Sequence, residues 1–314
     1  MRNRSCVVCG SIDEPRIRGG VRDYVTGDRF DVVQCRRCGF ATTHPVPASL
    51  DRYYPPRYRR FNPFAAFVLH YLYLRRVGGW VARLGPSGLA LEIGSGTGWM
   101  LRALRERGWR VVGSERSAEA AAASRAAAGV PMFAGDLEAV RPAPVLDLII
   151  MFHVLEHLAD PLAALRAAAA RLRPGGTLVL GLPNNASWQA RVAGSYWMHL
   201  DVPRHLCHFS PDTIERALSL TGFRLIRITF RSFEHDPLGW IQSGLDALGF
   251  EQGFVLKRLV GMHERRSGPL ATLGAYLVAL PLGVISVPLA LASWPARAGA
   301  VMEVWAVREG PNVD

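Results

Sequence analysis

The sequence predicts an α/β fold built around a doubly wound sheet, and three segments indicate it. An apolar strand runs into a glycine-rich turn and then a helix at LALEIGSGTG, from Leu89 to Gly98. The next apolar strand closes on the acid Glu115. A third segment, Val145–Met151, is apolar throughout and has the length of a buried strand. Apolar strands that alternate with helices in this way are typical of doubly wound α/β sheets.

The residues around the glycine-rich turn predict a nucleoside site. Gly94, Gly96 and Gly98 permit backbone conformations that other residues avoid, and they let a ligand approach the main chain closely. Glu92, at the end of the strand, is placed to meet an ammonium group such as that of a methionine moiety. Glu115 lies about twenty residues beyond the glycines, the usual distance for an acid that accepts hydrogen bonds from ribose hydroxyls.

A nicotinamide dinucleotide is the alternative ligand, because the spacing to Glu115 alone would suit it. However, GSGTG lacks the final spaced glycine of the G-x-G-x-x-G pattern, and the preceding acid Glu92 would repel a pyrophosphate. Dinucleotide binding is therefore the weaker interpretation. A third acid, Asp136, follows a short strand in VPMFAGDLEAV and extends the pattern of acids near strand ends.

These motifs together resemble the class I S-adenosylmethionine-dependent methyltransferases of types 11 and 23. VLDLIIMFHVLEHLADP and LRPGGTLVLGLPN look like the fourth and fifth strands of that family, and the resemblance covers roughly residues 60 to 230 plus a last strand near Val301–Val307. It implies a Rossmann-like sheet of seven strands with an antiparallel last strand, and S-adenosylmethionine as the cofactor. The cofactor contacts that it implies are Glu92, Gly94, Ser95, Gly96, Gly98, Glu115, Arg116, Asp136, Leu137 and Phe152.

Two Cys-x-x-Cys pairs near the N-terminus predict a structural zinc site. Cys6 and Cys9 form one pair, Cys35 and Cys38 form the other, and each pair is followed by glycine. Two such knuckles complete a tetrahedral shell of four thiolates, whereas a redox dithiol needs only one pair. A closed shell leaves no open position for catalysis, so the zinc is expected to fold the module. Cys207 stands apart and is expected to be unligated.

The chain is therefore expected to divide into five segments. These are a zinc ribbon at 1–45, a linker and N-terminal helical segment at 46–84, a methyltransferase core at 85–230, an apolar helical insertion at 231–300, and a last strand with a tail at 301–314. Phe64–Leu84 is expected to form the helix that leads into the sheet. Because the sequence shows no charged and apolar signal segment at its start, we expect a cytoplasmic protein.

Charge and composition set weaker limits on the partners. The formal net charge of +11 favours an anionic partner, such as a membrane surface, a nucleic acid or a phosphorylated substrate. Lys257 is the only lysine, and the other cations are arginines, which is typical of coding bias. We therefore give the net positive charge little weight as evidence of an anionic partner. Arginines interleaved with Tyr53, Tyr54 and Tyr58 suit base stacking. A zinc-ribbon protein that binds nucleic acid, or an RNA methyltransferase, is thus an alternative, although we favour a ribbon that shapes the catalytic cleft.

Methyl transfer from a sulfonium is a direct displacement that needs a base only where the acceptor carries a proton that must leave. Histidine suits that role because its pKa lies near neutrality. The candidate bases are His153 and His157, just after the fourth strand, and His199 and His205, in a second cluster with Tyr196, Asp201, Arg204 and His208. HFSP followed by an acid also indicates a helix start with Ser210 as N-cap and Pro211 in the first turn, which favours a structural role for His208.

Quinone-type O-methyltransferases with a similar signature use acids and a histidine here to bind a divalent cation. His153 stands where their first acid is expected, which leaves Glu156 and His157 and keeps metal assistance only as an alternative. For the acceptor, we expect a small molecule, a glycan or a lipid-linked compound, with O-methylation ahead of C- or N-methylation.

The insertion before the last strand predicts a membrane contact. Ser267–Ala296 contains no charged residue and is interrupted by Pro269, Pro281, Pro288 and Pro295. A single crossing would put the last strand on the wrong side of the bilayer, so we expect two helical arms that split at Pro281, too short to span. This hairpin, at residues 267–296, would contact the inner membrane face peripherally, with Lys257, Arg258, Arg265 and Arg266 at anionic headgroups. A hairpin buried against the catalytic domain or in a homodimer is the alternative.

Overall fold

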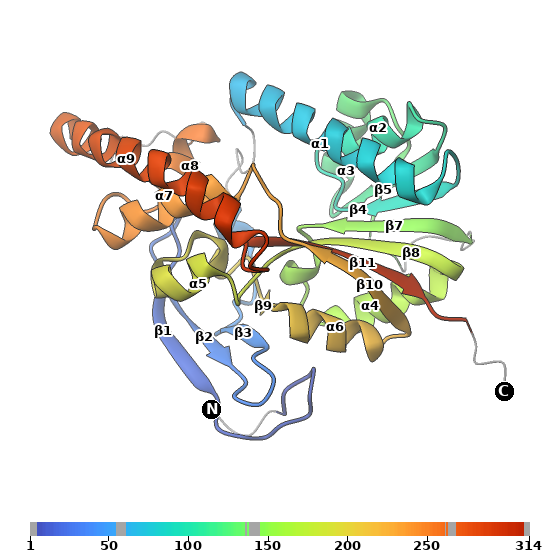
Figure 1. Ribbon diagram of the computed structural model, residues 1–314, viewed down its shortest axis with the longest axis horizontal. Helices are drawn as coiled ribbons and strands as arrows, with labels where there is room; N and C mark the ends of the chain where they lie inside the picture. The colour runs from blue at the N-terminus through green and yellow to red at the C-terminus, as the bar shows by residue number, and fades with distance from the viewer. Residues whose placement is uncertain are drawn as a thin grey trace. The chain divides into compact units, whose positions relative to one another are not determined.

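The computed structural model describes residues 5–54, 61–135, 137, 145–260, 262 and 268–310. Chain contacts divide it into two compact units (Figure 1). The ribbon unit comprises residues 1–66, 183–213 and 229–302, and the sheet unit comprises residues 67–182, 214–228 and 303–314. Each unit is described by itself below. Tyr58, Asp136, Arg265 and Arg266 lie outside the described residues.

A seven-stranded sheet forms the centre of the sheet unit and confirms the predicted fold class. Its order is β10 (Phe223–Thr229), β11 (Val301–Arg308), β8 (Leu172–Pro183), β7 (Leu146–Phe152), β4 (Leu89–Ile93), β5 (Arg110–Glu115) and β6 (Met132–Ala134). The pairs β4–β5, β4–β7, β5–β6 and β7–β8 are parallel. The last strands are antiparallel, as the resemblance implied.

Helices cover this sheet and bury its apolar strands. They are α1 (Pro63–Leu84), α2 (Trp99–Arg105), α3 (Ala118–Ala128), α4 (Pro161–Arg171) and α6 (Pro211–Ser219). Leu148 and Ile150 of β7 are fully buried in a core that also contains Trp80 of α1. The indole nitrogen of Trp80 donates a hydrogen bond to the Glu303 carboxylate over 3.1 Å. This bond ties α1 to the last strand, because Glu303 lies on β11.

Start signals of these helices agree with the sequence. The α3 helix begins after the N-cap Ser117, and α4 begins after the N-cap Asp160 with proline in its first turn. The Ser210 hydroxyl accepts a hydrogen bond from the Thr213 amide over 3.3 Å at the start of α6, as expected of an N-cap.

The ribbon unit contains a four-stranded antiparallel sheet in the order β1 (Arg16–Arg22), β2 (Arg29–Gln34), β3 (Ala41–His44) and β9 (Cys207–His208). The first three strands follow one another, whereas β9 comes from a distant part of the chain. The helices of this unit are α5 (Trp188–Ala193), α7 (Asp236–Ala247), α8 (Phe254–Leu259) and α9 (Pro269–Ser293).

The α9 helix corrects the expectation of a split hairpin. It runs without a break for 25 residues through Pro281 and Pro288. Proline inside a helix removes one hydrogen bond and costs about 3 kcal/mol. Here α9 packs along α7, and both prolines lie on its exposed side, so contacts with α7 outweigh that cost. In the described part of the chain, α9 is the one helix that is long and apolar enough to cross a membrane.

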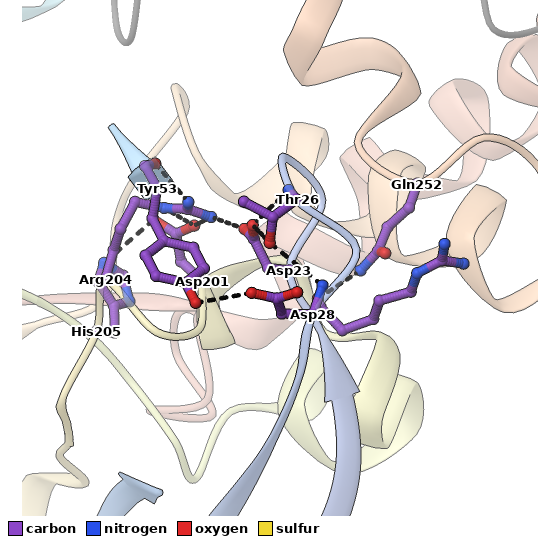
Figure 2. A network of polar contacts seen from close by, with 9 residues as sticks. Asp23, Thr26, Asp28, Tyr53, Asp201, Arg204, His205 and Gln252 are labelled. Atoms are coloured by element: carbon purple, nitrogen blue, oxygen red, sulfur yellow. Dashed lines mark hydrogen bonds and ion pairs between the residues drawn. The ribbon is translucent and has the colours of Figure 1, made fainter. Parts of the chain in front are cut away.

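Arg204 links three segments inside the ribbon unit (Figure 2). Its guanidinium, fully buried, contacts the Asp23 carboxylate at 2.7 Å and donates to the Tyr53 carbonyl over 2.8 Å. It also donates from Nε to Asp201 over 2.8 Å and lies 4.5 Å from the centre of the Tyr24 ring. Arg204, singled out from sequence beside the candidate histidines, is thus a buried anchor of the fold.

Replacement of Arg204 with methionine is expected to lower the free energy of unfolding by about 3–5 kcal/mol, because Asp23 is left buried without its cation. Urea denaturation of the two proteins measures the difference. A second change, Asp23→Asn in the same chain, should restore part of the loss.

Arg52→Met is the matched control, since the Arg52–Asp28 pair lies at the surface with the two side chains 63% and 38% exposed. It is expected to change stability by less than about 1 kcal/mol. Equal losses for Arg52→Met and Arg204→Met would contradict the role given to burial.

Candidate functional site

The turn after β4 has the geometry that its glycines predict. Gly94 and Gly96 adopt φ of +64° and +56°, a left-handed conformation that side chains rarely take. A Cβ at Gly94 would lie 2.7 Å from Val154 Cγ2, whereas a Cβ at Gly96 would have nothing within 4 Å. Gly94 is therefore required by packing, and the open side of Gly96 leaves the main chain accessible to a ligand.

Glu92 carries a buried carboxylate beside this turn. It lies on β4 and is 1% exposed. Among the described residues its Oε2 has no hydrogen-bond partner. Burial, and then the negative charge of Glu115, raise the pKa of Glu92 well above its usual range. A buried carboxylate without a partner is unfavourable, so this residue suits a cationic ligand group.

Glu115 ends β5, the strand next to β4. Its carboxylate accepts a hydrogen bond from the Gly96 amide, and burial raises its pKa. In the parallel register Ile93 lies opposite Ser114, so Glu92 and Glu115 flank the glycine turn from adjacent strands. The structure thus brings together both acids and the three glycines of the predicted site at one edge of the sheet.

Three other predicted contacts, Ser95, Arg116 and Phe152, lie at or just after the ends of β4, β5 and β7. Ser95 is buried, and its hydroxyl donates to the Ser114 carbonyl over 3.4 Å. Arg116 follows β5, and Leu137 is buried. The Phe152 ring lies 4.8 Å from the Arg76 guanidinium and directly over Gly181, where a Cβ would come within 2.6 Å of it.

Sequence reasoning missed an aromatic group beside the turn. Trp99, the first residue of α2, has its ring 5.3 Å from the His70 ring and 6.2 Å from the Tyr73 ring of α1. The aromatic residues of the YLY segment in α1 could have indicated this group. However, α1 precedes the first sheet strand, and its sequence contains no known cofactor-binding motif.

His153 follows β7 in a left-handed conformation, with φ of +57°. Its amide donates to the Gly181 carbonyl over 2.9 Å. Its Nδ1 lies 3.2 Å from Oε1 of Glu156, which is 1% exposed. A histidine whose second nitrogen is held by a carboxylate is the usual arrangement of an oriented base. His157 closes the 3-10 turn Leu155–His157.

The second histidine cluster belongs to the ribbon unit. The His199 ring lies 5.5 Å from the Trp197 ring and 5.8 Å from the His235 ring. His205 Nδ1 lies 2.9 Å from the His199 carbonyl oxygen. His208 Nε2 lies 2.9 Å from the Thr43 hydroxyl, and burial lowers the pKa of His208 to about 3. His208 therefore stays neutral and structural, as expected.

An open cavity of about 650 Å³ also lies in the ribbon unit. Its lining includes Arg22, Tyr24, Tyr196, Asp246 and Lys257. Tyr196 belongs to the histidine-rich segment singled out from the sequence, whereas none of the predicted cofactor contacts lines this cavity.

The four N-terminal cysteines converge as the sequence predicted. Cys6 Sγ lies 3.6 Å from Cys38 Sγ, Cys9 Sγ lies 3.6 Å from Cys35 Sγ, and all four sulfurs lie within 4.8 Å of one another. A tetrahedral zinc site with Zn–S bonds of about 2.3 Å needs sulfur separations of about 3.8 Å. The cluster therefore fits the geometry of a zinc ribbon. Cys207 is buried on β9.

Tyr53 offers little to a nucleic acid. Its side chain is 4% exposed, and its hydroxyl donates to the Asp28 carboxylate over 2.8 Å. Base stacking needs an accessible ring face. This observation weighs against the alternative of a linker that stacks on bases.

Comparison with known proteins identifies the family. Residues 68–228, half of the chain, match a family model described as a methyltransferase domain. A ubiquinone biosynthesis O-methyltransferase of Xanthomonas campestris pv. campestris is 37% identical over 76 residues, which cover 24% of this chain and 31% of that protein. The enzyme of the same name from Cupriavidus pinatubonensis is 25% identical over 215 residues, covering 63% of this chain and 84% of that protein.

The chain thus spans about a third of the length of the curated Xanthomonas relatives that it matches. Among solved structures, a SAM dependent methyltransferase from Archaeoglobus fulgidus is 16% identical with a TM-score of 0.49, covering 79% of this chain and 100% of that one.

Proposed function

The chain belongs to the methyltransferase-domain family of S-adenosylmethionine-dependent enzymes, and we propose that it methylates an oxygen of a small-molecule, glycan or lipid-linked acceptor. One observation carries the assignment of the cofactor site. Glu92 is buried at the glycine turn with a carboxylate oxygen that lacks a hydrogen-bond partner among the described residues. The ammonium group of the methionine moiety supplies the cation that this oxygen needs.

The remaining residues of the turn fit the same ligand. The open side of Gly96 admits a ribose close to the main chain. Glu115 offers carboxylate oxygens to ribose hydroxyls from the neighbouring strand. When bound, S-adenosylmethionine supplies a methyl group on a sulfonium, and the residues around it act chiefly by holding the acceptor in line. Ser95, Arg116, Asp136, Leu137 and Phe152 stay proposed contacts.

For acceptors that must lose a proton, we propose His153 as the general base. Glu156 holds one imidazole nitrogen, which orients the ring. The relatives named for ubiquinone biosynthesis are O-methyltransferases, which favours a hydroxyl acceptor here. His157, His199 and His205 are further candidates. Metal assistance stays an alternative through Glu156 and His157, because His153 stands where the first acid of the quinone-type enzymes is expected.

Titration with S-adenosylmethionine tests the cofactor site. Wild-type protein is expected to bind, and Glu92→Gln is expected to weaken binding by about 10- to 100-fold, the range for loss of a charge-assisted hydrogen bond. The affinity of wild type should rise with pH until Glu92 has lost its proton in the free protein, because the ammonium requires the carboxylate and the pKa is raised. Calorimetry at several pH values measures both effects.

Glu106→Gln is the control, since Glu106 lies exposed at the end of α2 and pairs with Arg102. It should leave the affinity and its pH dependence unchanged. A folded wild type that fails to bind, or a Glu92→Gln variant that binds with the wild-type pH profile, would contradict the proposed site.

His153→Asn tests the base. The variant is expected to lower kcat by about 10²- to 10⁴-fold with a hydroxyl acceptor found by screening with labelled methyl groups, while the affinity for S-adenosylmethionine stays within about twofold. The acidic limb of the rate profile against pH should disappear with it. His157→Asn, one turn away, is the comparison, and a loss confined to His157→Asn would transfer the role to that residue.

We further propose that the four cysteines hold one structural zinc ion. Metal analysis of the purified chain should find one zinc per chain, and Cys35→Ser should lose it and lower the melting temperature, because a structural zinc contributes to folding. Cys207→Ser is the matched control and should keep the metal. Full zinc content in Cys35→Ser would exclude the four-thiolate site.

A further inference from the structure

The α9 helix has two unlike sides. The side that faces α7 and α8 carries small residues: Ala275, Ser286, Ala290 and Ser293 are at most 3% exposed. The Ser286 and Ser293 hydroxyls donate to carbonyls within the helix, to Gly283 over 2.8 Å and to Ala290 over 2.7 Å. The two buried serine hydroxyls are thus satisfied within the helix.

The opposite side of α9 carries large aliphatic residues that are 48% to 85% exposed. They recur at spacings of three and four along the helix and form a continuous stripe: Leu270, Leu273, Leu277, Leu280, Val284, Val287 and Leu291. A helix of a water-soluble protein turns its large apolar residues inward and its polar residues outward. In α9 the fully buried residues are small, Val278 and Leu282 are partly buried beside them, and most of the large residues lie outside, as in helices that face lipid.

The absence of charged residues around this stripe favours lipid over a protein partner. No charged residue occurs from Ser267 to Ala296, so the stripe has no charged border within the helix. Protein interfaces have a polar rim, and paired helices carry charged residues beside their apolar seam. Proline is also more frequent in membrane helices than in soluble ones, and α9 contains Pro281 and Pro288. These features favour lipid over a second copy of the chain.

The contacts of α9 show which side of the helix is covered by protein. At its C-terminal end, the buried Asp236 of α7 accepts hydrogen bonds from the Trp294 indole and, over 2.7 Å, from the Ala300 amide. Near its N-terminal end, the Tyr276 ring lies 5.3 Å from the Phe254 ring of α8. In between, Leu282 contacts Gly244 of α7. Protein therefore covers one side along the length of α9, and only the outer stripe is available to lipid.

We propose that the outer stripe of α9 binds a phospholipid bilayer, with the helix parallel to the membrane plane at the boundary between headgroups and acyl chains. A helix of 25 residues presents a stripe about 37 Å long, and its affinity comes from the apolar area that enters the bilayer. Such a surface would bring the chain to lipid-linked or hydrophobic acceptors.

Flotation with vesicles of phosphatidylcholine and phosphatidylglycerol tests this surface. Wild type should float with the vesicles, and Leu273→Gln with Leu277→Gln and Leu280→Gln should partition at least about 100-fold less, because three aliphatic side chains no longer enter the bilayer. The matched control replaces three equally exposed aliphatic residues elsewhere, Val192, Leu220 and Ile226, with glutamine, and it should float as wild type does.

Cofactor titration and sedimentation of the same three proteins complete the test. A wild-type circular dichroism spectrum and melting temperature show that a variant is folded. Retained affinity for S-adenosylmethionine shows that the cofactor site is intact, so a failure of the lipid surface is separate from a failure of the proposed function. Wild type that stays below the vesicles, or an α9 variant that floats as well as wild type, overturns the proposal. A wild-type dimer that ignores vesicles and becomes monomeric in the α9 variant also overturns it, and assigns the stripe to self-association.

Discussion

The parallel register of β4 and β5 is the constraint on which the candidate cofactor site depends. Because neighbouring strands end at the same edge, Glu92 and Glu115 flank one glycine turn, and the negative charge of Glu115 adds to the cost of ionising Glu92. Glu92 is buried among apolar strands, and its Oε2 has no hydrogen-bond partner among the described residues. A cationic ligand removes that cost. Ionisation of Glu92 is therefore unfavourable in the free protein, and a bound cation would make it favourable. Local packing alone gives no reason for an acid at this position.

Short-range patterns in the sequence were enough to predict the sheet and its turn. An apolar run such as β7 indicates a strand that is buried on both faces. Glycine adopts a positive φ more readily than other residues, so Gly94 and Gly96 predicted the turn. The cysteine pairs were predictable for a similar reason, since the spacing in each knuckle sets where two sulfurs can point. For the strands and the glycine turn, the residues that determine the structure lie within one element or one turn. The two cysteine pairs are distant in sequence, and the four ligands that a structural zinc site requires predicted that they meet.

The features that escaped prediction depend on contacts between distant segments. Pro281 and Pro288 suggested a break, but packing of α9 on α7 holds the helix continuous. Arg204 was singled out only as a neighbour of the candidate histidines, because nothing nearby in the sequence shows that Asp23 and the Tyr53 carbonyl surround it. The left-handed conformation of His153, likewise, is imposed where β7 meets Gly181 of the next strand. The roles of polar residues are the hardest to predict from sequence, because their partners in the structure decide whether they stabilise the fold or bind a ligand.

Within the ribbon unit, the zinc knuckles and α9 are connected through one hairpin. The β1–β2 hairpin follows the first cysteine pair and leads to the second, and its tip is fixed by Arg204 and Asp23. Beside that tip, the side-chain amide of Gln252 (Figure 2) donates to the Arg22 carbonyl over 2.7 Å. The Tyr24 ring lies so near Gly253 that a Cβ there would come within 3.0 Å of it. Gln252 and Gly253 lead into α8, which contacts α9 through Phe254 and Tyr276. A continuous set of contacts therefore joins the cysteine cluster to α9, which would give the proposed structural zinc a physical role in presenting the outer stripe of α9 to the proposed bilayer.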